Sequence, residues 1–142
     1  MDNQSVRHFL ATLSYRFAKT VRDAPLHFPD VSIGNGVRTP IEIVNHMSHV
    51  LRCAANEFEK SDLTEADPLT WEEEVHGFNQ TLERLDGFLK RGFKPQCGSL
   101  EQIVQGPVSD AMTHVGQLAL LRRMAGSPIA GESFMSADIQ PD

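Results

Sequence analysis

The chain has 142 residues, of which 40% are hydrophobic and 23% are charged, and its formal net charge is -6. This length predicts a single domain over residues 1–142 that buries its own core, and the acidic balance argues against a nucleic-acid partner, because phosphate backbones bind concentrated positive surfaces. No apolar run reaches the roughly 20 residues of a membrane span and the N-terminal segment lacks the apolar core of a signal peptide, so we expect a cytoplasmic protein without a membrane partner.

Apolar residues at helical spacing predict a first helix from about Ser5 to Arg22. These residues are Val6, Phe9, Leu10, Leu13, Phe17 and Val21. The pattern then ends in a long loop, 24–38, in which two prolines and two glycines exclude a continuous helix. Such a loop serves as a lid, a binding segment or a mobile connection, and His27 within it is more often a histidine without a role than a pocket residue.

A second helix is predicted to begin after Thr39. Thr39 and Glu42 have the spacing of a capping box, and Pro40 suits the first helical position. The apolar stripe of this helix comprises Ile43, Val44, Met47, Val50, Leu51, Ala54 and Phe58. At about 100° per residue, His46 falls at the edge of the stripe and His49 lies toward solvent. His46 is therefore the better candidate for an inward-pointing ligand, although a histidine in this position is also commonly satisfied by a carbonyl group or water.

The two cysteines, Cys53 and Cys97, are too few for a disulfide framework and form no CxxC pair. We therefore expect two reduced thiols and no cysteine-based zinc site. Cys53 follows His46 by two helical turns, which places its thiol on the same side of the predicted helix. A buried, inert thiol is the commoner interpretation of such a residue.

An acidic connector, 61–68, is predicted to be a solvated loop. Thr70 then caps a third helix, with Glu73 at capping-box spacing, and the run of glutamates that includes Glu74 is expected on an exposed face. The apolar stripe of this helix comprises Trp71, Val75, Phe78, Leu82, Leu85 and Leu89, and its regular spacing indicates a core face.

The last helix is predicted to begin at Ser99, which has Gln102 at capping-box spacing. Gly106 and Pro107 interrupt this helix, so we expect a kink or a restart there. Gly126 marks its end, and the irregular tail that follows is expected to fold back over the helices.

Asp110, His114 and Gln117 lie on one ridge of the last helix, because residues three and four apart share a helical face. Carboxylate and imidazole groups are both ligands of divalent transition metals. A metal needs further ligands, however, and an isolated Asp–His pair at this spacing is more often a solvated ion pair. Gly116 and Leu120 occupy a flank with little charge, which would suit a second subunit and predicts a homodimer.

Four amphipathic helices predict an all-α four-helix bundle, with a long loop between the first two helices and an irregular C-terminal tail. In the segments TPIEIVNHMSHVL and DAMTHVGQLALLRRMAGSP, and over most of its length, the chain resembles the DinB/YfiT-like family of metal-binding four-helix bundles. In that family, one histidine of the second helix and two residues four apart on the fourth helix bind a divalent ion such as zinc or nickel.

The resemblance implies that His46, Asp110 and His114 bind a metal. Many relatives have histidine at the position of Asp110, so the ligand set here would be two imidazoles and one carboxylate. This set still suits a divalent transition metal but leaves its identity open among zinc, nickel, iron and manganese. Gln117 would hold a ligand or a bound water by a hydrogen bond.

Family members with assigned activities are thiol-dependent S-transferases or isomerases, and many others are labelled metal-dependent hydrolases. The resemblance thus implies an enzyme that activates a low-molecular-weight thiol or water for attack on a small electrophilic substrate. No spacing argument selects a general base among His27, His49 and Glu57. Two alternatives stay open: a non-catalytic metal- or ligand-binding dimer, and a helical interaction module without a metal.

Overall fold

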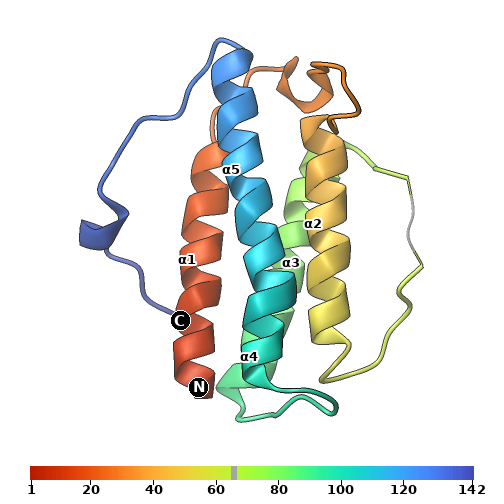
Figure 1. The fold of residues 1–142 in the computed structure, drawn as a ribbon, viewed down its shortest axis with the longest axis vertical. Coiled ribbons are helices and arrows are strands. Elements are labelled where there is room, and N and C mark those ends of the chain that lie inside the picture. Colours follow the sequence, from red (N-terminus) through yellow and green to blue (C-terminus); the bar gives the residue numbers. More distant parts are fainter. Residues whose placement is uncertain (65–66) are drawn as a thin grey trace.

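The computed structural model describes residues 1–64 and 67–142, and within these ranges it contains helices and no strand. Three helices and one composite segment form a bundle: α1 (Asn3–Val21), α2 (Pro40–Ala55), α3 (Trp71–Lys90), and a segment made of α4 (Leu100–Ile103), the π-helical turn η2 (Val104–Val108) and α5 (Ser109–Met124) (Figure 1). The prediction of an all-α protein is therefore confirmed. Two residues of the predicted acidic connector, 65 and 66, lie outside the described ranges.

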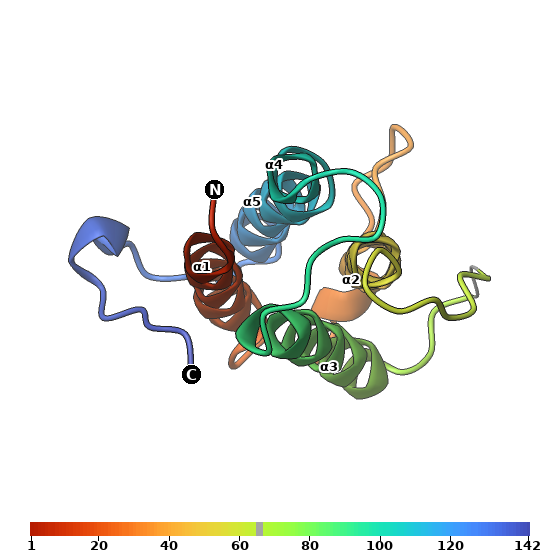
Figure 2. The ribbon, with the colours of Figure 1, turned by 90° about the horizontal axis from the view of Figure 1, so that it is seen from below.

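The end-on view in Figure 2 shows the helices at the corners of a square, with α1 beside α3, α3 beside α2, and α2 beside α5. In Figure 1, α1 and α5 run upward while α2 and α3 run downward, so α2 and α3 are parallel neighbours. This arrangement places α2 directly against α5, and these two helices carry the candidate ligands. Among the described residues, every helix is too short or too polar to span a lipid bilayer.

Local sequence signals explain where α2 and α3 begin. The Thr39 side chain accepts a hydrogen bond from the Glu42 backbone, and the Glu42 carboxylate accepts one from the Thr39 backbone N–H at 2.9 Å, which completes the predicted capping box. At α3 the prediction is half right. Thr70 caps the Glu73 backbone N–H at 3.2 Å, but the Glu73 carboxylate accepts from the Thr70 hydroxyl instead of its backbone.

The first and last helical segments also begin at side-chain caps. The predicted capping box of Ser99 and Gln102 is present. The first helix starts at Asn3, two residues earlier than predicted, because the Asp2 carboxylate accepts a hydrogen bond of 2.7 Å from the Ser5 backbone N–H. An N-cap of this kind satisfies a backbone donor that a helix leaves free at its start.

The core lies between the helices and is formed by the predicted apolar stripes. Phe17 of α1 and Phe78 of α3 are fully buried, and their ring centroids lie 4.2 Å apart. Phe9 is an exception to the predicted stripe, since its side chain is 42% exposed. The composite last segment contributes Ile103, Val108, Ala111, Val115, Leu118 and Leu121 to the buried set.

The expectation that Glu74 lies on an exposed face is wrong, because its side chain is only 7% exposed. Its Oε1 accepts hydrogen bonds from Asn45 Nδ2 at 3.1 Å and from the Leu69 backbone N–H at 2.9 Å. These bonds satisfy a carboxylate that would otherwise be costly to bury. They also link α3 to α2 at the residue next to His46.

The predicted irregularity at Gly106 and Pro107 takes the form of a π-helical turn over Val104–Val108. Proline has no backbone N–H to donate within a helix, so the regular hydrogen-bond ladder is interrupted there. The Ser109 hydroxyl donates to the Val104 carbonyl at 2.6 Å, and α5 continues from the turn without a side-chain cap. The helix is thus reshaped immediately before Asp110.

The loop between α1 and α2 is anchored to the bundle by a single turn of 3-10 helix, η1 (Phe28–Asp30). Phe28 is fully buried and meets Trp71 edge to face, with ring centroids 5.8 Å apart. The guanidinium of the buried Arg122 lies 5.6 Å from the same ring. His27 is exposed and makes a 3.3 Å contact with the Ala125 carbonyl, so this loop folds against the end of α5.

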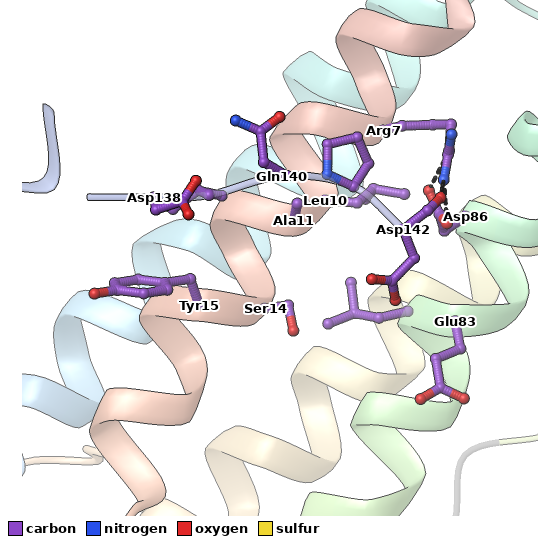
Figure 3. Close-up of a pocket in the computed structure, with 13 residues that line it drawn as sticks. Arg7, Leu10, Ala11, Ser14, Tyr15, Glu83, Asp86, Asp138, Gln140 and Asp142 are labelled. Carbon is purple, nitrogen blue, oxygen red and sulfur yellow. Dashed lines mark hydrogen bonds and ion pairs between the residues drawn. The ribbon is translucent and has the colours of Figure 1, made fainter. Parts of the chain in front are cut away.

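The C-terminal tail, 127–142, folds back over α1 as predicted and includes a second 3-10 turn, η3 (Phe134–Ser136). Ile139 is buried, and the tail encloses a cavity of about 290 Å³ against α1 and α3. Figure 3 shows Arg7 at the edge of this cavity, where its guanidinium binds the Asp86 carboxylate at 2.7 Å and also donates to the Asp142 backbone carbonyl.

Replacing Phe17 with alanine is expected to lower the free energy of unfolding by about 3–5 kcal/mol, because removing a fully buried ring leaves a cavity. Phe9→Ala on the same helix is the matched control, and we expect it to cost less than about 1.5 kcal/mol because the ring is partly exposed. Urea unfolding followed by circular dichroism measures both values. Equal losses in the two variants would contradict this placement of the core.

Candidate metal site

The structure brings together the three residues that the sequence selected as ligands. His46 comes from α2, and Asp110 and His114 come from α5. The Nε2 atoms of His46 and His114 each lie 3.4 Å from Asp110 Oδ2, and one ligand atom from each of the three residues lies within 4.8 Å of the others. The two imidazole rings meet edge to face with centroids 4.8 Å apart. We call this group the His46–Asp110–His114 triad.

Gln117 determines which nitrogen of His114 is available. The Gln117 Oε1 lies 2.7 Å from His114 Nδ1. A carbonyl oxygen can only accept, so this contact favours the tautomer of His114 in which Nδ1 carries the proton and donates a hydrogen bond to Gln117. In the neutral ring this leaves an unprotonated Nε2 that faces Asp110. The predicted role of Gln117 as a residue that holds a ligand by a hydrogen bond agrees with this geometry.

Burial and nearby positive charges lower the pKa of His46 below its usual value of 6.5. Burial has the largest effect, followed by the charges of Arg38 and His114, while the Asp110 carboxylate acts in the opposite direction. The neutral imidazole is the form that binds metals. Arg38, an exposed residue of the loop before α2, was not selected from the sequence, and no local pattern marks it as a neighbour of the site.

The donor set suits a divalent transition metal, and each imidazole nitrogen lies at a suitable distance from the carboxylate oxygen. Two ligand atoms that lie about 2.1 Å from a zinc ion at the tetrahedral angle are about 3.4 Å apart. Both Nε2–Oδ2 distances in the triad have this value. With a neutral His114, the carboxylate oxygen and Nε2 are two acceptors facing each other without a proton between them. A cation would turn this repulsion into shared coordination.

The triad is open on one side. The Asp110 side chain is 45% exposed and that of His46 is 24% exposed, whereas His114 is only 10% exposed. A groove of about 560 Å³ between α2 and the η2–α5 junction reaches Asp110 and is lined on its other sides by residues such as Cys53, Pro107 and Thr113. A small molecule or water can therefore approach the carboxylate side of the triad.

The prediction that His49 lies toward solvent is wrong. The ring is half-buried, and its Nδ1 is buried without a hydrogen-bond partner in the described part of the chain. Its Nε2 lies 3.8 Å from the Cys53 thiol, one turn further along α2. Both Cys53 and Cys97 are free thiols, as expected.

The other candidate bases make contacts away from the triad. His27 contacts the Ala125 carbonyl, and the Glu57 carboxylate accepts a 3.2 Å hydrogen bond from the Cys97 backbone N–H. Neither contact brings the side chain to the triad.

Comparisons of the chain with protein-family models, with curated proteins and with solved structures found no match.

We expect the neutral His114 ring to carry its proton on Nδ1, because Gln117 Oε1 accepts a hydrogen bond from that atom. The Gln117→Leu variant should lose this preference, since leucine has no acceptor. Long-range proton–nitrogen correlation spectra of chelator-treated protein at mildly alkaline pH report the tautomer. A predominant Nε2–H tautomer in the unsubstituted protein would show that the nitrogen facing Asp110 is not free to bind a metal.

Proposed function

We propose that His46, Asp110 and His114 bind one divalent transition metal. The observation that carries this proposal is the convergence of two imidazole nitrogens on one carboxylate oxygen, each at 3.4 Å, from two helices that are far apart in sequence. The hydrogen bond from His114 Nδ1 to Gln117 supports it, because such a bond orients a metal-binding imidazole and leaves the other nitrogen free.

Zinc and nickel are the metals we favour, with iron and manganese as alternatives. Imidazole nitrogen suits zinc, nickel and iron, while a carboxylate in place of a third imidazole adds a harder ligand and one negative charge. Three protein ligands leave coordination positions for exchangeable molecules. The exposure of Asp110 and the groove beside it are in keeping with an open site and not with a closed structural one.

For the activity, we propose a DinB/YfiT-like, metal-dependent enzyme that joins a low-molecular-weight thiol, or water, to a small electrophilic substrate. A divalent ion with open positions lowers the pKa of a bound thiol or water, which is the chemistry that this reaction needs. In this proposal the two histidines and Asp110 hold the metal, Asp110 borders the groove through which a substrate approaches, and Gln117 keeps His114 in the required orientation.

A second candidate function is a non-catalytic, metal-binding homodimer. Two observations favour it. First, the candidate bases His27 and Glu57 contact other parts of the chain and not the triad. Second, α5 exposes apolar side chains. Leu120 is 58% exposed and Met124 is 54% exposed, on the helix that also presents Gly116. In this alternative, the metal stabilises the α2–α5 contact and the exposed part of α5 packs against a second copy.

Purified protein loaded with zinc or nickel is expected to hold one ion per chain, and His114→Ala should lower the affinity by at least about 100-fold, because it removes a direct ligand. Isothermal titration and elemental analysis measure both quantities. The helical circular dichroism spectrum should persist, since the core does not depend on this side chain.

His49→Ala and His76→Ala are the matched controls for His114→Ala. His76 is exposed on α3 and His49 faces Cys53, so neither change should alter metal stoichiometry. Full binding by His114→Ala, or its loss in His49→Ala with binding kept in His114→Ala, would show that the ligands are assigned to the wrong residues.

Turnover distinguishes the enzyme from the non-catalytic dimer. We expect metal-loaded protein to accelerate the reaction of a low-molecular-weight thiol with 1-chloro-2,4-dinitrobenzene, or the hydrolysis of a p-nitrophenyl ester, and His114→Ala to lose this acceleration. Absorbance assays with several thiols measure it. Stoichiometric metal binding without any acceleration, together with a dimer in analytical ultracentrifugation, would favour the second function.

A further inference from the structure

A cysteine–histidine pair lies on α2 outside the triad. Cys53 Sγ and His49 Nε2 are 3.8 Å apart, at the spacing of one helical turn. Cys53 lines the groove of about 560 Å³ that reaches Asp110, and it also lines an adjoining cavity of about 310 Å³ that reaches Cys97. A small molecule can therefore approach this thiol through the groove, and the proposed metal site uses neither member of the pair.

The environment of His49 determines where its proton lies. Its Nδ1 is buried and has no hydrogen-bond partner in the described residues, so an N–H at that position would lose the bond that it makes with water. The neutral ring therefore carries its proton on Nε2, the atom that faces the sulfur of Cys53. An N–H group at this position can donate a hydrogen bond to the sulfur and hold it toward the groove.

We propose that Cys53 is a nucleophilic thiol that exchanges with small uncharged aliphatic disulfides in this groove, with His49 as its positioning residue. The sulfur of Cys53 attacks one sulfur of the disulfide while its own proton passes to solvent. A new S–S bond forms as the old one breaks, and the departing thiolate takes a proton from water. The products are a mixed disulfide on Cys53 and one free thiol, so no further oxidant is required.

The groove suits a ligand of this class. Apart from Asp110, its lining is uncharged and comprises Val50, Cys53, Gln105, Gly106, Pro107, Ser109 and Thr113. Aliphatic carbons can contact the apolar members, and hydroxyl groups of the ligand can bond to the polar ones. Because the disulfide is uncharged, its binding should not depend on whether a metal ion neutralises the Asp110 carboxylate.

Cys97 provides a control within the same chain. It is exposed, whereas Cys53 is half-buried, so exposure alone predicts that Cys97 reacts faster. The Glu57 carboxylate accepts a hydrogen bond from the Cys97 backbone and lines the same cavity as both thiols, so it does not distinguish them. Within the described residues, a histidine nitrogen lies beside the sulfur of Cys53 and none lies beside that of Cys97. The proposal therefore predicts the opposite order of reactivity from the one that exposure predicts.

The test uses the full chain carrying either Cys97→Ser, which leaves Cys53, or Cys53→Ser, which leaves Cys97. Both variants are treated with 2-hydroxyethyl disulfide at neutral pH after incubation with a chelator, and adduct formation is followed by intact mass spectrometry. We expect Cys53 to react at least about tenfold faster than Cys97. An equal or faster reaction at Cys97 would overturn the proposal.

The role of His49 is tested in the Cys97→Ser background. His49→Leu should slow the reaction at Cys53 severalfold, and His49→Gln should retain part of the rate, because its amide N–H can still donate to sulfur. A merely loosened helix would expose the thiol and raise the rate, so a fall identifies the donor. Unchanged or raised rates in both variants, with normal helicity, would refute the role of His49.

This inference goes beyond the proposed metal-dependent function and does not depend on it. His114→Ala in the Cys97→Ser background should lose the metal but keep the reaction at Cys53. A failure of metal binding and a failure of thiol reactivity are therefore separate results.

Discussion

The Asp110 carboxylate faces two imidazole nitrogens that come from different helices, and this contact requires α2 and α5 to hold a fixed position along each other. A shift of α5 by one residue would turn Asp110 by about 100° away from His46. The register is maintained by the apolar faces packed between the helices, to which Met47 and Leu118 contribute fully buried side chains. The geometry of the site is thus a consequence of core packing more than of attraction among the three groups.

Polar contacts at the ends of the helices restrict this register further. The capping box at Thr39 sets the first turn of α2, and Asn45 binds the buried Glu74 of α3 next to His46. At the same end of the bundle, the buried Arg122 of α5 donates to the carbonyls of Thr20, in the last turn of α1, and of Arg22, its C-cap residue. Buried polar groups that are paired in this way favour one arrangement of the helices, because alternatives would leave them without partners.

The π-helical turn explains how a buried helix presents an accessible carboxylate. Gly106 and Pro107 interrupt the hydrogen-bond ladder one turn before Asp110, and the groove beside this turn separates α2 from the last helical segment. His114, one turn further on, is almost buried, whereas Asp110 is half exposed. The same groove reaches Cys53, so the proposed metal site and the proposed reactive thiol share one opening while using different residues.

The sequence alone determined the helices and most of their caps, and with the family resemblance it selected His46, Asp110 and His114 as candidate ligands. Capping signals and apolar periodicity are local, so they located the starts of α2 and α3 to within a residue and placed His46 at the edge of the apolar stripe. The predicted stripe of α2 ran on to Phe58, however, three residues beyond the end of the helix at Ala55. The same reasoning failed for His49 and Glu74, because a half-polar position is exposed or buried according to which helix packs beside it. Only the tertiary structure decided that α2 lies against α5, that His46 meets Asp110 there, and that His49 faces Cys53. These outcomes depend on contacts between residues far apart in sequence, which no periodicity within a single helix encodes.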